Sequence, residues 1–220
     1  MDDARIDSRV IALYPPIRSF RRRGRMTPAR KRRWAEFAPR FCIAMADLDV
    51  WRPTHLDIGF GSGESVLATA RDYPGARVLG VEVHEAGLTH LMSALADSDI
   101  ENVRVIRHDI VEVMPSLRQG SLSEISIFFP DPWPKAAHAR RRLVRAEVVE
   151  LLVDRLAPGG VLRLATDADH YARQMRDVCD ANVRLENVEP PRRVTTKYER
   201  LGREAGRTIT DLGYRRLPAR

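Results

Sequence analysis

One stretch of this 220-residue sequence, residues 128–143, gathers side chains that could do chemistry. It reads FFPDPWPKAAHARRRL, in which Asp131 and Trp133 alternate with three prolines and are followed by a lysine and three arginines. Prolines restrict the backbone, so they would hold the acid and the ring in place. Cations ahead of a helix oppose its dipole and contribute little to folding. The stretch therefore predicts a rigid, acidic and aromatic loop backed by basic groups for an anionic partner.

A glycine-rich turn suggests a nucleotide-like cofactor. In DIGFGSGES, residues 57–65, Gly59, Gly61 and Gly63 let the backbone turn tightly and let a ligand approach it closely. Glu82 closes the next predicted strand about twenty residues later, where a carboxylate can accept both ribose hydroxyls. This pattern fits a nicotinamide cofactor nearly as well as S-adenosylmethionine (SAM).

Two further acids favour SAM over a nicotinamide dinucleotide. Asp57 directly precedes the glycines, and Asp109 closes a third predicted strand, where it could accept a hydrogen bond from an adenine amino group. Acids suit SAM, which carries a sulfonium and an ammonium, whereas a pyrophosphate prefers helix N-termini and cations. Each acid alone could be a helix cap or a turn residue. Acids at successive strand ends indicate a ligand.

The elements that must position these residues alternate along the chain. Apolar strands are predicted at 55–60, 76–83, 102–109, 124–129 and 161–167, and helices at 63–73, 85–98, 141–156 and 170–181. Such alternation implies a parallel sheet with helices on both faces, and ligands bind at the carboxyl ends of its strands. Residues 192–216 could add one or two antiparallel strands, in which Lys197 and Glu199 would point to one face.

The formal charge of +7 is unevenly distributed. Residues 1–40 carry a net +8, residues 41–191 a net −7, and residues 192–220 a net +6. Basic blocks attract polyanions, so nucleic acid is the favoured partner. An acidic membrane surface and solvated basic tails are the alternatives.

The composition excludes several classes of protein. Apolar residues make up 44% of the sequence, which is typical of a globular chain. No run approaches the ~18 apolar residues of a membrane span, and no apolar signal segment is seen, so a cytoplasmic protein is expected. Cys42 and Cys179 have neither the spacing of a metal site nor that of a disulfide framework, so no metal is expected.

Six motifs, in this order, resemble the bacterial tRNA (guanine-N7)-methyltransferase family: GFGSGES, GVEVH, HDIVEV, FFPDPWPK, ATDADHY and TKYE. FFPDPWPK is the most specific, and the likeness runs from about Ile17 nearly to the end of the chain. It implies an α/β three-layer sandwich, the Rossmann-like class I methyltransferase fold with a mostly parallel seven-stranded sheet. We therefore expect residues 1–40 to form a flexible, RNA-contacting basic arm, and residues 41–220 to form a SAM-dependent methyltransferase domain.

The resemblance also implies an activity and its residues. Members transfer the SAM methyl group to N7 of guanine 46 in the tRNA variable loop. Asp131 matches the catalytic position. The SAM-binding positions are Asp57, Gly59, Gly61, Gly63, Glu82, Asp109 and Asp131, and the substrate-binding positions are Lys135, Asp167, Thr196, Lys197, Tyr198 and Glu199. In one departure, Ala136-Ala137 stands where the family places a further basic residue before the histidine; Arg140 to Arg142 could replace it.

These residue types suit the implied reaction. Guanine N7 carries a lone pair and no proton, so its methylation needs positioning and electrostatics rather than a strong base. Asp131 could stabilise the developing cationic purine or accept from guanine N1–H and N2–H. Trp133 could stack on an extruded base or plug the core, whereas Phe128 and Phe129 are expected in the core.

Three other functions fit parts of the sequence. Asp-Pro-Trp resembles the loop of enzymes that methylate exocyclic amines of nucleic acids. The glycine turn also fits a nicotinamide oxidoreductase, and the basic ends also fit a non-catalytic RNA-binding protein with a vestigial SAM pocket. We expect tRNA as the partner, without a membrane or a metal, and a monomer or a homodimer.

Overall fold

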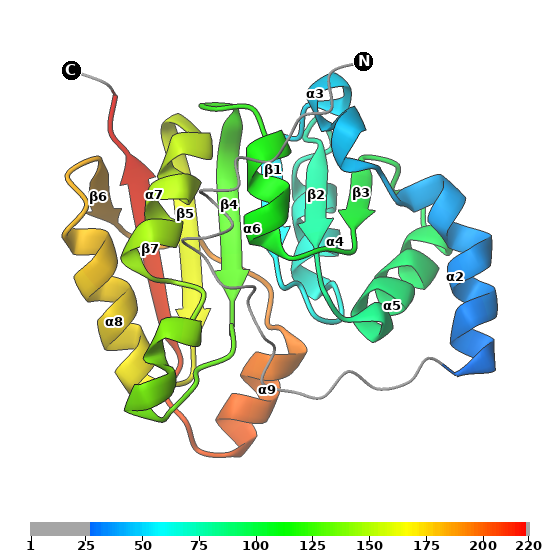
Figure 1. The fold of residues 1–220 in the computed structure, drawn as a ribbon. Coiled ribbons are helices and arrows are strands. Elements are labelled where there is room, and N and C mark those ends of the chain that lie inside the picture. Colours follow the sequence, from blue (N-terminus) through cyan, green and yellow to red (C-terminus); the bar gives the residue numbers. More distant parts are fainter. Residues whose placement is uncertain (1–26, 219–220) are drawn as a thin grey trace.

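The computed structural model describes residues 27–218, which build one seven-stranded sheet in the order β3-β2-β1-β4-β5-β7-β6 (Figure 1). Every pairing among β1 to β5 is parallel, and β7 runs antiparallel to both of its neighbours. The predicted fold class is thereby confirmed. The strands are β1 (His55–Ile58), β2 (Val78–Val81), β3 (Val103–Ile106), β4 (Leu122–Phe128), β5 (Leu156–Thr166), β6 (Leu185–Val188) and β7 (Thr210–Arg216).

Helices cover both faces of this sheet, with α6 and α7 in front of it and α4 behind it in Figure 1. The helices are α2 (Pro28–Phe41), α3 (Leu48–Trp51), α4 (Glu64–Asp72), α5 (Glu85–Ala96), α6 (Ile110–Val113), α7 (Ala146–Arg155), α8 (Asp169–Asp180) and α9 (Lys197–Glu204). Short 3₁₀ turns occupy Met45–Asp47, Met114–Ser116 and Ala136–Arg141.

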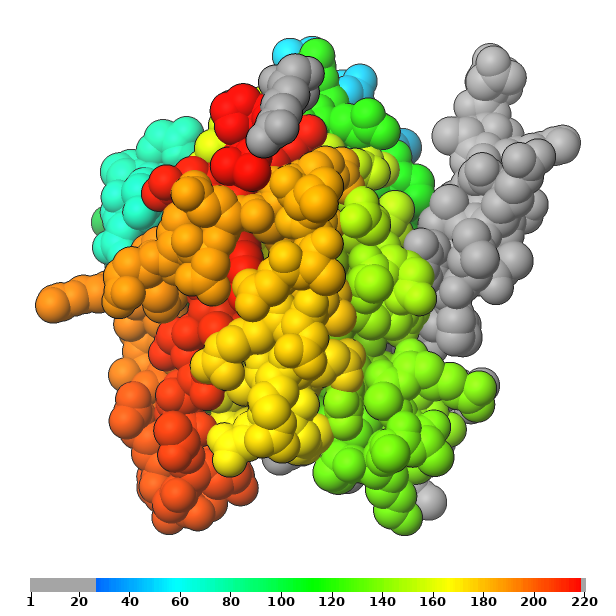
Figure 2. All heavy atoms as spheres, turned by 90° about the vertical axis from the view of Figure 1, so that its left-hand side faces the viewer, coloured from blue at the N-terminus to red at the C-terminus, as the bar shows by residue number. Residues whose placement is uncertain are grey.

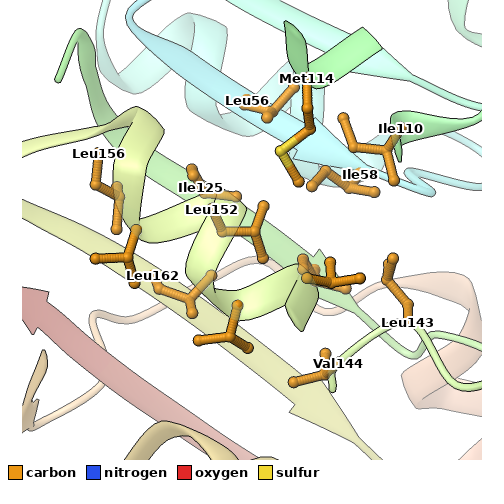
Figure 3. Packing of buried hydrophobic residues seen from close by; sticks show 14 of the residues in the cluster. Leu56, Ile58, Ile110, Met114, Ile125, Leu143, Val144, Leu152, Leu156 and Leu162 are labelled. Atoms are coloured by element: carbon orange, nitrogen blue, oxygen red, sulfur yellow. The ribbon is translucent and has the colours of Figure 1, made fainter. Parts of the chain in front are cut away.

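Strand alternation divides the apolar core between the two faces. Because successive strand residues point to opposite sides, Leu79 packs into one cluster and its neighbour Val78 into the other. The larger cluster lies under α6 and α7, where Leu152 packs among Ile125 and Leu162 of the strands (Figure 3). The smaller cluster joins β2 and β3 to α2, α4 and α5. Packing on both faces fixes the positions of the strands, so the carboxyl ends of the parallel strands lie side by side along one edge of the sheet.

Helix α2 contains the second part of the predicted basic arm. Thr27 caps it, since its hydroxyl accepts a hydrogen bond from Arg30 N at 3.3 Å, and Pro28 occupies the first turn. The helix packs against α5 and β3 through its buried Phe41. The predicted boundary at residue 40 therefore falls in the last turn of this helix, and residues 1–26 lie outside the described residues.

The C-terminal segment differs in part from its prediction. Residues 210–216 do form an antiparallel strand, β7, but Lys197–Glu204 is the helix α9, so the extended interpretation of Lys197 and Glu199 was wrong. The spacing Thr196-x-x-Glu199 is that of a capping box, and Thr196 Oγ1 accepts from Glu199 N at 3.3 Å. Figure 2 shows this side of the molecule, where β7 (red) emerges between α8 (yellow) and the orange segment that includes α9.

Among the helices of residues 27–218, none combines the length and the apolar character that a membrane span requires. In the same part of the chain, no three His, Cys, Asp or Glu side chains gather where they could hold a metal ion.

Candidate active site

A cavity of about 790 Å³ opens at the carboxyl ends of β1 to β4. Each of these strands contributes predicted residues to its wall, and α9 covers it from the side of the C-terminal segment. The topology thus brings together predicted residues as far apart in the sequence as Gly59 and Tyr198, which are 139 positions apart. The predicted residues on the wall are Gly59, Gly61, Glu82, Asp109, Asp131, Lys197 and Tyr198.

The glycine-rich turn, residues 59–63, lies in close contact with α9. Gly61 has a left-handed backbone with φ of 60°, and a Cβ placed there would lie 2.9 Å from Cε2 of Tyr198. Gly63, with φ of 88°, does not line the cavity; a Cβ there would meet Leu91 of α5 at 2.8 Å. Gly61 therefore shapes the cavity wall, whereas Gly63 allows α4 and α5 to pack closely.

Glu82 ties the glycine turn to the end of β2. Its buried carboxylate accepts backbone hydrogen bonds from Val83 and His84 at 2.7 and 2.8 Å through Oε1, and from Gly61 at 3.0 Å through Oε2. A carboxylate oxygen can accept two bonds, so Oε2 retains acceptor capacity on the cavity wall. The predicted ribose contact stays a prediction, and the structural role of Glu82 is an addition to it.

Asp57 lies behind the cavity wall and is 4% exposed. Among the described residues neither carboxylate oxygen meets full hydrogen-bond geometry, and the Ser65 side chain provides only an imperfect contact. Burial raises the pKa of Asp57 to about 7; the Ser65 side chain opposes this rise, and the charge of Glu124 adds to it. A buried carboxylate left in this state costs free energy, which a cationic ligand or a bridging water would recover. This orphaned acid fits a cofactor with positive charge.

Asp109 serves as the N-cap of α6 and also lines the cavity. Its Oδ1 accepts a hydrogen bond from Val111 N at 3.0 Å. The helix-cap alternative is therefore confirmed, and the contact with adenine stays a prediction.

The loop after β4 presents Asp131 to the cavity, half-buried, between two residues of unusual backbone. Phe129 and Trp133 have φ values of 54° and 39°, a region that bulky residues rarely adopt. Phe129 lines the cavity instead of packing in the core, so its predicted core position was wrong, whereas Phe128 is buried as predicted. The loop turns sharply on both sides of the acid and fixes its direction.

Trp133 belongs to this loop, but its side chain is only 7% exposed and packs into the protein interior. The Arg141 guanidinium lies 5.0 Å from the ring centroid, and His138 meets the ring edge-on at 5.6 Å. Trp133 and Arg141 both line the cavity. Because the ring is almost fully buried and already contacts Arg141 and His138, the structure favours the core interpretation of Trp133 over stacking on a base.

The basic run behind the loop does not start a helix, because α7 begins only at Ala146. Lys135 and Arg140 are exposed, and Lys135 does not line the cavity. Arg142, by contrast, is buried. The run therefore divides into exposed cations that could meet a phosphate, Arg141 on the cavity wall, and the buried Arg142.

The predicted residues Thr196 and Glu199 belong to the framework of α9. Glu199 is 4% exposed and receives Arg193 Nη1 at 2.5 Å and Arg203 Nη2 at 2.8 Å. Burial would raise the pKa of Glu199, but the hydrogen bonds and charges of Arg203 and Arg193 outweigh it and hold this pKa below its usual value. Thr196 is buried as the cap. The two residues between them, Lys197 and Tyr198, are the ones that reach the cavity.

Asp167 also stands apart from the cavity wall. Its Oδ2 accepts from Arg207 Nε at 2.7 Å, and it lies close to Gly202 of α9. Like Glu199, it helps to hold α9 at the sheet.

The sequence interpretation missed several cations on the cavity wall. Arg30 and Arg33 reach it from α2, and Arg200 reaches it from α9 while pairing with Glu64 at 3.4 Å. The acid-free segment 8–35 signalled a basic arm, but only the packing of α2 on α5 places two of its arginines at the cavity.

Comparison with known proteins places the chain in a family. The family model described as "Putative methyltransferase" matches residues 51–212. The tRNA (guanine-N(7)-)-methyltransferase of Leifsonia xyli is 48% identical over 91% of this chain and 96% of its own length. That of Thiobacillus denitrificans is 43% identical over 92% and 96%. An aminoglycoside resistance methyltransferase, NpmB1, shares the fold with a TM-score of 0.55 at 18% identity, covering 80% of this chain and 95% of its own. By its motifs, its fold and these relatives, the chain belongs to the tRNA (guanine-N(7)-)-methyltransferase family.

Proposed function

We propose that this protein transfers the methyl group of SAM to N7 of a guanine in tRNA, guanine 46 of the variable loop, to form 7-methylguanosine. The observation that carries the proposal is the position of Asp131. It lines the same cavity as the glycine turn, Glu82 and Asp109, so a base and a cofactor could meet there. The family relationship supplies the substrate.

The cavity suits SAM in its charges and its shape. Glu82 would accept from the ribose hydroxyls, Asp109 would face the adenine, and the orphaned Asp57 would favour the cationic end from behind the wall. Gly61 lets a ligand approach the backbone. When bound, SAM supplies the electrophilic methyl group.

Asp131 supports the reaction as a fixed negative charge. Guanine N7 has no proton to lose, so the acid would accept from N1–H and N2–H and would stabilise the purine as it becomes cationic. The prolines and the two left-handed residues around it keep this charge in place before the base arrives. Lys197 and Tyr198 border the same space from α9.

Surface cations would hold the RNA backbone. Lys135 and Arg140 are exposed beside the loop, and Arg30 and Arg33 extend the basic rim along α2. Such contacts give strong salt dependence to binding. Residues 1–40 would act as the RNA-contacting arm, with 41–220 as the methyltransferase domain. Action on tRNA in the cytoplasm, by a monomer or a homodimer, stays part of the prediction.

The experiment is transfer of labelled methyl from SAM to unmodified tRNA transcript, with nucleoside analysis of the product. Wild-type protein should give 7-methylguanosine. Asp131→Ala should lose about 10²-fold or more of the rate, as expected when a preorganised charge is removed. Asp72→Ala, at an exposed acid on α4, is the matched control and should leave the rate unchanged.

Other products would identify the alternatives. N6-methyladenine would indicate methylation of an exocyclic amine. Salt-dependent tRNA binding without any transfer would indicate a non-catalytic RNA-binding protein. Binding of a nicotinamide cofactor and not of SAM, measured by calorimetry, would indicate an oxidoreductase. A transcript in which guanine 46 is replaced by adenine should not be labelled if the position is correct.

A further inference from the structure

Arg142 is the most buried member of the basic run, with 7% of its surface exposed. All three nitrogens of its guanidinium donate hydrogen bonds. Nε reaches the Pro132 carbonyl at 2.9 Å, Nη2 the Trp133 carbonyl at 3.1 Å, and Nη1 the Gln174 side-chain oxygen at 2.5 Å. These bonds use three of its five N–H groups, and because the side chain is buried it is poorly placed to meet a phosphate.

Two of those acceptors are the carbonyls of the two residues that follow Asp131. This loop contains the left-handed Phe129 and Trp133, and such backbones persist only where the surroundings hold them. The planar fork of an arginine fits two neighbouring carbonyls at fixed angles. Arg142 therefore fastens the part of the loop that sets the direction of the acid.

The other end of this clamp is anchored in α8. Gln174, which accepts from Arg142, donates through Nε2 to the Val144 carbonyl at 2.8 Å. The buried Tyr171 accepts from Val144 N at 2.9 Å, and its ring lies 5.5 Å from the Arg142 guanidinium carbon. Through these bonds the loop after β4 is tied to a helix that follows β5.

We propose that Arg142 is the positioning residue for Asp131: it connects the Asp131 loop to α8 and holds the carboxylate at the cavity in the orientation that methyl transfer needs. The inference rests on the proposed function, since it assigns Asp131 to that reaction. It separates Arg142 from Lys135 and Arg140, whose exposed side chains suit contact with RNA.

Arg142→Lys tests this role, because lysine keeps the charge and loses the fork. The control is Arg176→Lys, the same change at an exposed position on α8. Single-turnover methyl transfer at saturating tRNA and SAM should slow by roughly 10- to 100-fold for Arg142→Lys, as expected for a misplaced acid. The KM for tRNA and its salt dependence should stay at the wild-type values. Arg176→Lys should match the wild type in the single-turnover rate, the KM for tRNA and the salt dependence.

A second measurement reports on the loop without activity. The sequence has three tryptophans, so protein labelled with 5-fluorotryptophan should give three ¹⁹F signals, and Trp133→Phe assigns one of them. Arg142→Lys should shift or broaden the Trp133 signal alone. If this variant fails to fold, Gln174→Met decides, since it removes the partner of Arg142 in α8, while His170 keeps its own contact with the Pro132 carbonyl at 3.2 Å. It should reduce the rate and move the same signal in the same direction.

The outcomes separate the two proposals. An unchanged rate and an unchanged Trp133 signal in Arg142→Lys would overturn the positioning role. A raised KM for tRNA with a shallower salt dependence, at unchanged saturating rate, would show instead that Arg142 binds phosphate. Absence of 7-methylguanosine from the wild type would reject the proposed function, while a shifted Trp133 signal would still show that Arg142 holds the loop.

Discussion

Tyr198 lies directly against Gly61: a methyl group added at the glycine would stand 2.9 Å from ring carbon Cε2. Gly61 belongs to the turn after β1, and Tyr198 belongs to α9, so a residue near the C-terminal end of the chain defines the width of the predicted cofactor site. Two groups of ion pairs support this contact: Arg193 joins Glu199 of α9 to Asp211 of β7, and Arg207 after α9 pairs with Asp167.

Gly61→Ala should weaken SAM binding by at least about tenfold. The new methyl group would meet the Tyr198 ring, and φ of 60° is strained for alanine. Titration calorimetry measures the affinity. Gly206→Ala is the control. Gly206 also has a left-handed backbone, with φ of 69°, but no atom lies within 4 Å of the added methyl group. This variant should therefore have a strained backbone and an unchanged affinity for SAM. Tyr198→Ala in the Gly61→Ala background should recover part of the affinity; no recovery would contradict the steric cause.

Asp57→Asn should change how stability depends on pH. An aspartate in the unfolded chain has a pKa of about 3.9, whereas burial raises the pKa of Asp57 in the folded protein to about 7. Between these values only the folded protein keeps the proton. This contribution to stability is therefore fully present below about pH 4 and is lost as the pH rises to about 7. The Asp57→Asn variant has no carboxyl group at this position, so its stability does not fall in this way as the pH rises.

Urea unfolding at a series of pH values measures the effect. The free energy of unfolding of Asp57→Asn, relative to the wild type, should increase from pH 4 to pH 7 and then level off. Asp72→Asn, at an exposed acid of α4, should give a constant difference over the same range. Parallel curves for Asp57→Asn and the wild type would contradict the raised pKa.

Glu199→Gln should destabilise the protein by about 2 kcal/mol, because the nearly buried Arg193 loses its charged partner in α9 and keeps only Asp211 of β7. Urea unfolding measures this loss, and a methyl-transfer assay should show reduced activity as α9 moves away from the cavity. Glu204→Gln, at an exposed glutamate of the same helix, is the control and should change neither quantity. Reduced activity with unchanged stability would instead support direct contact between Glu199 and the substrate.

Ala137→Lys should strengthen tRNA binding several-fold. Ala137 is exposed in the 3₁₀ turn after the Asp131 loop, where the family resemblance implies a further basic residue. One added phosphate contact should steepen the dependence of log K on log salt by about 1. Filter binding at several salt concentrations tests this, with Ala181→Lys, exposed at the far end of α8, as the control. An equal gain in both variants would mean that only net charge matters.

Local patterns in the sequence were sufficient to predict the sheet and the residues at its strand ends. Gly61, Glu82 and Asp131 each follow a recognisable apolar strand, so their place at one edge follows from the parallel topology. Arg142 was harder, because its inward direction depends on Gln174, a residue 32 positions away with no local signal. Helix α9 was missed although the Thr196-x-x-Glu199 spacing was visible, since its short polar sequence also fits an exposed strand.

The position of β7 between β5 and β6 has a consequence for the order of assembly. As the chain is synthesised, β1 to β5 can pair with one another once each has emerged. β6 has no partner in the sheet until β7 follows it, because β7 supplies all of its pairing. α9 lies between these two strands in the sequence, so the wall that it forms should close last. A nascent chain that stops before Thr210 would thus have the acids of β1 to β4 in place and an unfinished, open cavity.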